Sequence, residues 1–169
     1  MKDYKVLFAD LDGTLIETIS GATFPKGIWD MRFKFDVLDK IKELKPELIA
    51  IVTNQGGIEQ GFVNERDFAK GKMAFVTRSI QEYTGCKCIF QYCPTNRKDS
   101  IYRKPNTGML DQVLYKDFGQ QGIWAEKKDM LMIGDASGKP GQFSDTDKKT
   151  AENYGIDYMD VEDFVKKGE

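Results

Sequence analysis

Short apolar runs alternate along the chain with longer stretches whose apolar residues recur at helical spacing. The runs that predict strands are Tyr4–Ala9, Leu48–Val52, Cys86–Tyr92 and Met130–Ile133. The stretches that predict helices are Phe35–Leu44, Asn64–Tyr83, Thr107–Phe118, Asp147–Tyr154 and the closing Val161–Lys166. Strands that alternate with helices favour crossover units on a parallel sheet, so we expect a doubly wound, Rossmann-like α/β fold.

Polar clusters follow the predicted strands at the points where those strands end. They are found at Asp10, at Thr53, within 93–104 and at Asp135. In a parallel sheet of this kind, ligands bind outside the carboxyl ends of the strands. We therefore expect all of these clusters to lie at one edge of the sheet.

The chain has no internal repeat and no Gly/Ser-rich linker, and its 169 residues suit one domain. The interval between Asp10 and Thr53 already holds a helix and a strand, which leaves only residues 16–35 for an insertion. The interval from Thr53 to Lys104 is filled by a helix, a strand and a loop. We expect a single domain, 1–169, with a small flap at 16–35 and no large lid over the site.

Composition excludes several kinds of chemistry. The chain has no histidine, which removes Ser-His-Asp and Cys-His catalysis, while 25 basic and 27 acidic residues leave no uniformly basic surface for nucleic acid. Three cysteines, an odd number, argue against a disulfide framework. No apolar run approaches the roughly 20 residues that span a bilayer, and the charged start of the chain does not resemble a signal peptide. These features favour a cytoplasmic protein that does not enter a membrane.

Two carboxylates, Asp10 and Asp12, directly follow the first predicted strand and precede Gly13. A carboxylate can attack phosphorus and form an aspartyl-phosphate, and a neighbouring carboxyl can protonate the leaving oxygen and later activate water. Glycine would let the chain turn close to a phosphate. The same D-x-D-G string is also typical of an ordinary β-turn, but the later clusters in register favour the catalytic interpretation.

The remaining clusters offer groups that bind phosphate or metal. The Asn54 amide and nearby backbone N–H groups can hold phosphoryl oxygens, and Lys104 can neutralise developing negative charge. Asp135 and Asp10 together offer the oxygen ligands that Mg²⁺ prefers. For the second acid near the last helix, Asp147 and Asp145 both remain possible from the sequence, and Asp145 is also a candidate helix cap.

The string Asp10-Leu-Asp12-Gly-Thr-Leu15 resembles motif one of the haloacid dehalogenase (HAD) superfamily of phosphotransferases. That resemblance implies that Asp10 is the nucleophile and Asp12 the general acid–base. It also implies that Thr53 and Lys104 hold the phosphoryl group, with Asn54, Gln55 and Arg103 as neighbouring substrate-binding residues. The implied Mg²⁺ ligands are Asp10, Asp135, Asp147 and the backbone carbonyl of Asp12.

A finer resemblance is to the polynucleotide kinase 3′-phosphatase family. The matching segments are Asp10–Ile16, Ser20-Gly21, Phe24-Pro25, Thr53–Gln55, Tyr102–Met109, Gly134–Gly138, Phe143–Asp147, Asn153–Gly155 and Glu162–Phe164. The resemblance implies a 3′-phosphorylated DNA end as substrate and a role in DNA repair. The sequence departs from the family in two ways: it has no G-x-x-x-x-G-K-[ST] loop, so we expect no 5′-kinase activity, and Gln142 replaces an acidic residue.

Two other functions remain open from the sequence. One is a small-metabolite phosphatase of the sugar-bisphosphate or histidinol-phosphate branch, whose Cys/His zinc loop cannot form without histidine. Zinc held by Cys86, Cys88 and Cys93 is conceivable, although alternating cysteines on a strand are more often buried apolar residues. The other is a non-catalytic phosphate or nucleic-acid binding module. We expect no obligate protein partner. We expect nucleic-acid contacts from loop cations and exposed aromatic residues, namely Lys26, Arg97, Lys98, Arg103, Lys139, Lys148, Phe24, Trp29 and Tyr102.

Overall fold

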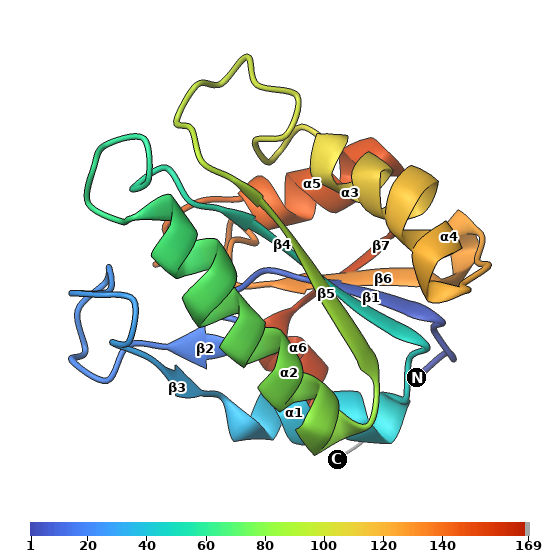
Figure 1. Cartoon of the computed structure of the whole chain (residues 1–169). Coiled ribbons are helices and arrows are strands. Elements are labelled where there is room, and N and C mark those ends of the chain that lie inside the picture. Colours follow the sequence, from blue (N-terminus) through green and yellow to red (C-terminus); the bar gives the residue numbers. More distant parts are fainter. Residues whose placement is uncertain (168–169) are drawn as a thin grey trace.

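A parallel five-stranded sheet forms the centre of the computed structural model, which describes residues 1–167 (Figure 1). Its strand order is β5-β4-β1-β6-β7. The strands are β1 (Val6–Ala9), β4 (Leu48–Asn54), β5 (Lys87–Cys93), β6 (Met130–Gly134) and β7 (Asp157–Asp160). All of the pairings within this sheet are parallel, which confirms the predicted α/β class.

Helices cover both faces of the sheet, as a doubly wound fold requires (Figure 1). One face is covered by α1 (Phe35–Leu44), α2 (Met73–Thr84) and α6 (Val161–Lys166). The other is covered by α3 (Gly108–Gln112), α4 (Phe118–Gln121) and α5 (Thr146–Tyr154). Side chains of β1 alternate between the two cores: Leu7 and Ala9 pack on the first face, Val6 and Phe8 on the second. Such two-sided burial explains why the central strands are continuous apolar runs.

Two of the predicted helices contain π-helical segments. Helical structure in the predicted 64–83 region begins at Glu65, passes through the π segment Asp67–Lys72 and continues as α2. It starts after Asn64 because the Asn64 Oδ1 accepts a hydrogen bond of 3.0 Å from the Asp67 N–H. The predicted 107–118 helix is likewise α3, then the π segment Val113–Asp117, then α4. The short 3₁₀ helix Lys127–Asp129 precedes β6.

Three strands are absent from the sequence prediction: β7, β2 (Ile16–Glu17) and β3 (Arg32–Phe33). Strand β7 was not predicted because Asp-Tyr-Met-Asp is short and polar, and it pairs with β6 at the edge of the sheet. Within the expected flap, β2 pairs antiparallel with β3. The loop between them is organised by Asp30, whose carboxylate accepts hydrogen bonds from Ser20 and from the Lys26 N–H.

Among residues 1–167, no helix combines the length and the apolar character that a membrane crossing requires.

Candidate active site

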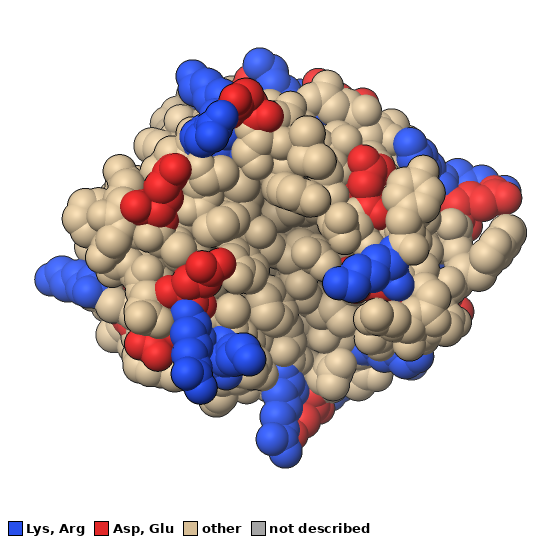
Figure 2. All heavy atoms as spheres, turned by 45° about the horizontal axis from the view of Figure 1, so that its top comes forward, with Lys and Arg blue, Asp and Glu red and all other residues tan. Residues whose placement is uncertain are grey.

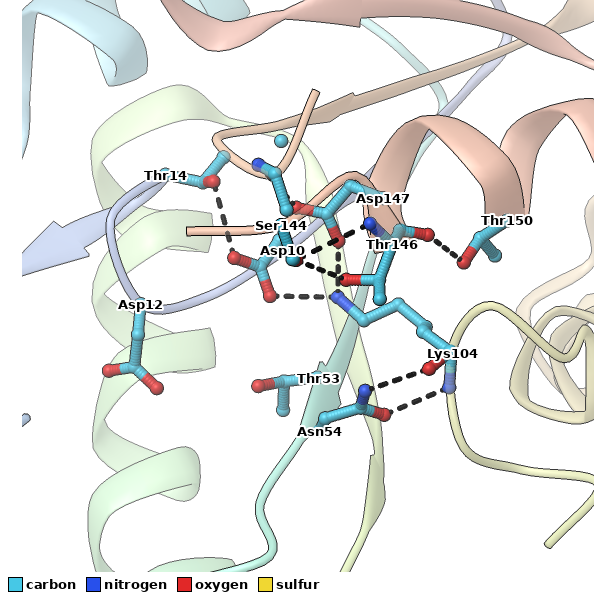
Figure 3. Close-up of polar contacts among 12 residues, drawn as sticks. Asp10, Asp12, Thr14, Thr53, Asn54, Lys104, Ser144, Thr146, Asp147 and Thr150 are labelled. Carbon is cyan, nitrogen blue, oxygen red and sulfur yellow. Dashed lines mark hydrogen bonds and ion pairs between the residues drawn. The ribbon is translucent and has the colours of Figure 1, made fainter. Parts of the chain in front are cut away.

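Three of the predicted site residues lie side by side at the carboxyl edge of the sheet. Asp10 directly follows β1, Thr53 is near the end of β4, and Asp135 directly follows β6. Strand β1 lies between β4 and β6, so Asp10 stands between the other two residues. Figure 3 shows Asp10, Asp12, Thr53 and Lys104 around a common space. The structure therefore brings together groups from four separate segments of the chain.

Lys104 is the cation at the centre of the site. Its Nζ lies 2.8 Å from Asp10 Oδ1 and 2.6 Å from Asp147 Oδ1, and the side chain is only 3% exposed. Asn54 fixes the Lys104 backbone, because its Oδ1 accepts from the Lys104 N–H (3.0 Å) and its Nδ2 donates to the Lys104 carbonyl (3.2 Å). The Asn54 amide is thus engaged in positioning the lysine rather than pointing freely at a phosphate.

Gln55 links the loop after β1 to the end of β4. Its Nε2 donates to Asp12 Oδ2 and to Thr53 Oγ1, both at 2.9 Å. On the other side of Asp10, the Thr14 hydroxyl lies 3.4 Å from Asp10 Oδ2. Sequence reasoning missed both of these positioning roles, although Thr14 belongs to the same D-x-D-G-T string.

Three carboxylates form a group that could hold a divalent cation. One oxygen from each of Asp10, Asp135 and Asp147 lies within 4.8 Å of the other two. Two glycines permit this approach: a Cβ on Gly13 would lie 2.0 Å from Asp135 Oδ2, and a Cβ on Gly134 would lie 2.4 Å from Asp147 Oδ2. Clustered hard oxygen donors of this kind suit Mg²⁺.

Burial and mutual repulsion perturb the protonation of these carboxyls. Burial, together with the nearby charge of Asp135, raises the pKa of Asp10 to about 7 despite the opposing Lys104. Burial and the charge of Asp10 raise the pKa of Asp147 to about 6, and burial also raises the pKa of Asp135. For Lys104 burial lowers the pKa, but the two adjacent carboxylates outweigh it and leave the pKa above its ordinary value. The three carboxyls of the site outnumber its one ammonium group, and this excess of negative charge suits the binding of a cation.

The structure distinguishes the two acids near α5. Asp147 is 1% exposed, and its Oδ2 accepts from the Ala136 N–H at 3.1 Å while its Oδ1 faces Lys104. Asp145 instead forms a partly exposed ion pair with Lys149 at 3.1 Å. Asp145 occupies the position before α5 but makes no side-chain cap hydrogen bond. Asp147 is therefore the acid that reaches the site.

Arg103 lies apart from the carboxylate group. Its Nη1 donates to the Thr95 carbonyl at 3.2 Å, and among residues 1–167 it forms no ion pair with the site aspartates. Other loop cations are paired nearby: Arg97 with Asp99, and Lys139 with Asp163. Figure 2 shows basic and acidic side chains interspersed on the face that carries the loops after β4 and β5. Among the described residues, this face has no continuous basic patch.

The cysteines do not form a metal site. Cys86 and Cys88 pack in the core on one face of the sheet, whereas Cys93 packs in the core on the opposite face. All three are free and buried, and burial raises the pKa of the Cys88 thiol above its ordinary value. They act as apolar core residues, and the Cys86, Cys88 and Cys93 zinc site is excluded by their positions.

Known structures share this architecture. The crystal structure of D,D-heptose 1.7-bisphosphate phosphatase from B. bronchiseptica, complexed with magnesium and phosphate, superposes with a TM-score of 0.67 at 19% identity. The superposition covers 91% of this chain and 78% of that one. This likeness shows the fold, a Rossmann-like HAD fold, here with only a small flap. Fold and homologues together define a HAD-type phosphatase, a phosphomonoester hydrolase.

The chain belongs to the polynucleotide kinase 3 phosphatase family, whose sequence profile matches residues 5–165. A bifunctional polynucleotide phosphatase/kinase of Schizosaccharomyces pombe is 32% identical over 96% of this chain, which spans 38% of that protein's length. A probable D-glycero-D-manno-heptose-1,7-bisphosphate 7-phosphatase of Thermoplasma volcanium is 29% identical over 83% of this chain and 91% of that protein. The relatives therefore include both polynucleotide and sugar phosphatases.

Proposed function

We propose that this protein removes the 3′-phosphate from polynucleotide (DNA) ends through an aspartyl-phosphate on Asp10, as a step in DNA repair. The observation that carries the proposal is the Lys104 ammonium 2.8 Å from Asp10, at the carboxyl edge of a sheet whose insertion after β1 is only the two-stranded flap. A site without a large lid suits a phosphate on the end of a long molecule. Membership of the polynucleotide kinase 3 phosphatase family supports the same substrate.

In the first half-reaction, a carboxylate oxygen of Asp10 attacks phosphorus in line with the ester oxygen. The new Asp10–phosphorus bond forms as the bond to the 3′-oxygen breaks, and Asp12 transfers its proton to that oxygen. Gln55 holds the Asp12 carboxyl in place, and Thr53 and Lys104 bind the phosphoryl oxygens. The products of this step are a free 3′-hydroxyl and the phosphorylated enzyme.

In the second half-reaction, the ionised Asp12 accepts a proton from a water molecule. The water oxygen attacks phosphorus, the bond to Asp10 breaks, and inorganic phosphate is released. Mg²⁺ held by Asp10, Asp135, Asp147 and the backbone carbonyl of Asp12 would neutralise phosphoryl oxygens and keep the Asp10 carboxylate ionised. Asp12 returns to its protonated form, so the catalytic cycle is closed.

A small-metabolite phosphatase is the second candidate function. The Thermoplasma volcanium relative favours it, since that protein is named for a sugar bisphosphate and matches most of this chain. Turnover of a 3′-phosphorylated oligonucleotide, compared with a panel of sugar phosphates and histidinol phosphate, separates the two. We expect a higher kcat/KM for the oligonucleotide. If the oligonucleotide is no better than a generic aryl phosphate, the polynucleotide assignment is wrong.

Gly13→Ala should damage the site far more than Gly21→Ala. Both glycines have positive φ, +83° and +79°, so the backbone strain is similar. Only at Gly13 does a Cβ meet the Asp135 carboxylate, whereas nothing lies within 4 Å of a Cβ at Gly21. We expect kcat to fall about 100-fold or more in Gly13→Ala, because Asp135 must move. Equal activities of the two variants would show that the position of Asp135 does not matter.

Without metal, the protein should lose stability as the pH rises from about 5 to about 7. Asp10 and Asp147 have pKa values of about 7 and about 6 in the folded state, above the ordinary 3.8. The folded chain therefore binds more protons than the unfolded chain in this window, and the free energy of unfolding falls as those protons leave. Urea unfolding in EDTA measures the effect, and Mg²⁺ should reverse it at the upper pH. A free energy of unfolding that rises across this window in EDTA would contradict the charge balance described here.

A further inference from the structure

Lys72 is a buried cation that the mechanism above does not use. It lies at the end of the π segment Asp67–Lys72, next to α2, and is only 3% exposed. Within residues 1–167, its ammonium group has no hydrogen-bond acceptor and no ion-pair partner within 4.0 Å. In the same residues, the Tyr154 hydroxyl is the one fully enclosed side-chain nitrogen or oxygen without a hydrogen-bond partner. The Lys72 nitrogen, which also has no partner, therefore keeps some contact with solvent.

An unpaired buried ammonium costs the fold free energy, because water solvates charge better than a protein interior does. Burial lowers the pKa of Lys72, and the negative charges of Asp12 and Asp30 oppose that shift. π-Helical turns such as the one that ends at Lys72 are frequent at functional sites. A buried cation without a partner in the protein is typical of a ligand-binding position.

The two buried lysines interact with different carboxylates. Lys104 is paired with Asp10 and Asp147, where the phosphoryl group would be transferred. Lys72 instead experiences the charges of Asp12 and Asp30. Asp12 is the proposed proton donor to the leaving oxygen. Phe68 and Met73, on either side of Lys72 in the helical segment, belong to the same core cluster as Leu11, which directly precedes Asp12. Asp30 organises the flap loop through Ser20 and Lys26 and is therefore itself already engaged.

We propose that Lys72 binds a second phosphate group carried by the leaving group, namely the internal phosphodiester of the terminal nucleotide of a 3′-phosphorylated strand. This inference rests on the proposed function and names a contact that would favour polynucleotides over simple phosphomonoesters. The Lys72 ammonium has no partner in the protein, so it can form a charge-assisted hydrogen bond to a phosphate of the substrate. A sugar bisphosphate also carries a second phosphate, so the experiment must separate these two sources.

The test compares Lys72→Met with Lys70→Met, which removes an exposed lysine from the same helical segment. For each protein, kcat/KM is measured on a 3′-phosphorylated thymidine dinucleotide and on thymidine 3′-phosphate, which lacks the internal phosphodiester. We expect the ratio of the two values to fall about tenfold in Lys72→Met, the usual effect of losing one charge-assisted hydrogen bond, and to be unchanged in Lys70→Met. The salt dependence of KM for the dinucleotide should also become shallower in Lys72→Met.

An unchanged ratio in Lys72→Met, with both values lowered equally, would overturn the proposal and make Lys72 a structural residue. A hexose bisphosphate and a hexose monophosphate form the second substrate pair, and a ratio that falls only for this pair would overturn the phosphodiester assignment. Thermal melting checks folding, and Lys72→Gln repeats the assay if the methionine variant is unstable. If the wild-type protein prefers sugar phosphates throughout, the proposed function itself is wrong, whatever Lys72 does.

Discussion

Asp10→Asn should abolish phosphate release while leaving the protein folded. The substitution keeps the shape of the side chain but removes the attacking oxygen, and losing a nucleophile costs about ten-thousandfold or more in kcat. Folding should survive, because Lys104 keeps its contact with Asp147 at 2.6 Å. Steady-state release of inorganic phosphate from a 3′-phosphorylated oligonucleotide measures the loss, and circular dichroism checks the fold.

Asp145→Asn is the matched control for Asp10→Asn. Asp145 is an aspartate of the same sheet edge, but its carboxylate pairs with Lys149 and does not face the site. We expect this variant to retain wild-type kcat. If the Asp10 variant retained substantial turnover, a water molecule rather than Asp10 would be the nucleophile.

Lys104→Met should damage both catalysis and stability. The substitution leaves the buried carboxylates of Asp10 and Asp147 without their shared cation, and breaking a buried ion pair costs about 3–5 kcal/mol. Urea unfolding at neutral pH in EDTA measures the loss, and phosphate release should fall to background because the phosphoryl oxygens lose their cation. Lower pH should restore part of the stability, since both carboxyls then become neutral.

The control for the stability effect is Lys148→Met, which removes an exposed lysine from α5. We expect its free energy of unfolding to be unchanged. Equal stability of the Lys104 and Lys148 variants would mean that the buried ion pairs contribute nothing to the fold.

Apolar patterning was sufficient to predict four of the five strands of the central sheet, but not β7 or the flap strands. Strands β1, β4, β5 and β6 were predicted because burial of the sheet leaves them continuously or largely apolar. Strand β7 escaped because its four residues, Asp-Tyr-Met-Asp, are too few and too polar to give an apolar run, whereas β5 at the other edge is longer and more apolar. The β2–β3 pair in the flap is too short to leave a periodic signal.

The strand-end residues of the site could be predicted, whereas the side chains that position them could not. Asp10, Thr53 and Asp135 follow from the rule that parallel strands expose their carboxyl ends at one edge. The sequence placed Asn54 and Gln55 beside the site, but only the structure shows that Asn54 holds the Lys104 backbone and that Gln55 holds Asp12. Nothing in the string Lys-Gly-Lys distinguishes the buried Lys72 from the exposed Lys70, because burial there depends on tertiary packing.

Chemical trapping of the phosphorylated enzyme identifies which carboxylate reacts. The protein is mixed with a 3′-phosphorylated oligonucleotide and Mg²⁺, quenched during turnover with hydroxylamine, digested and sequenced by tandem mass spectrometry. Hydroxylamine converts an acyl phosphate into a hydroxamate, and we expect that product at residue 10, dependent on substrate. A hydroxamate at Asp12, Asp135 or Asp147, or at no residue while phosphate is released at the full rate, would contradict attack by Asp10.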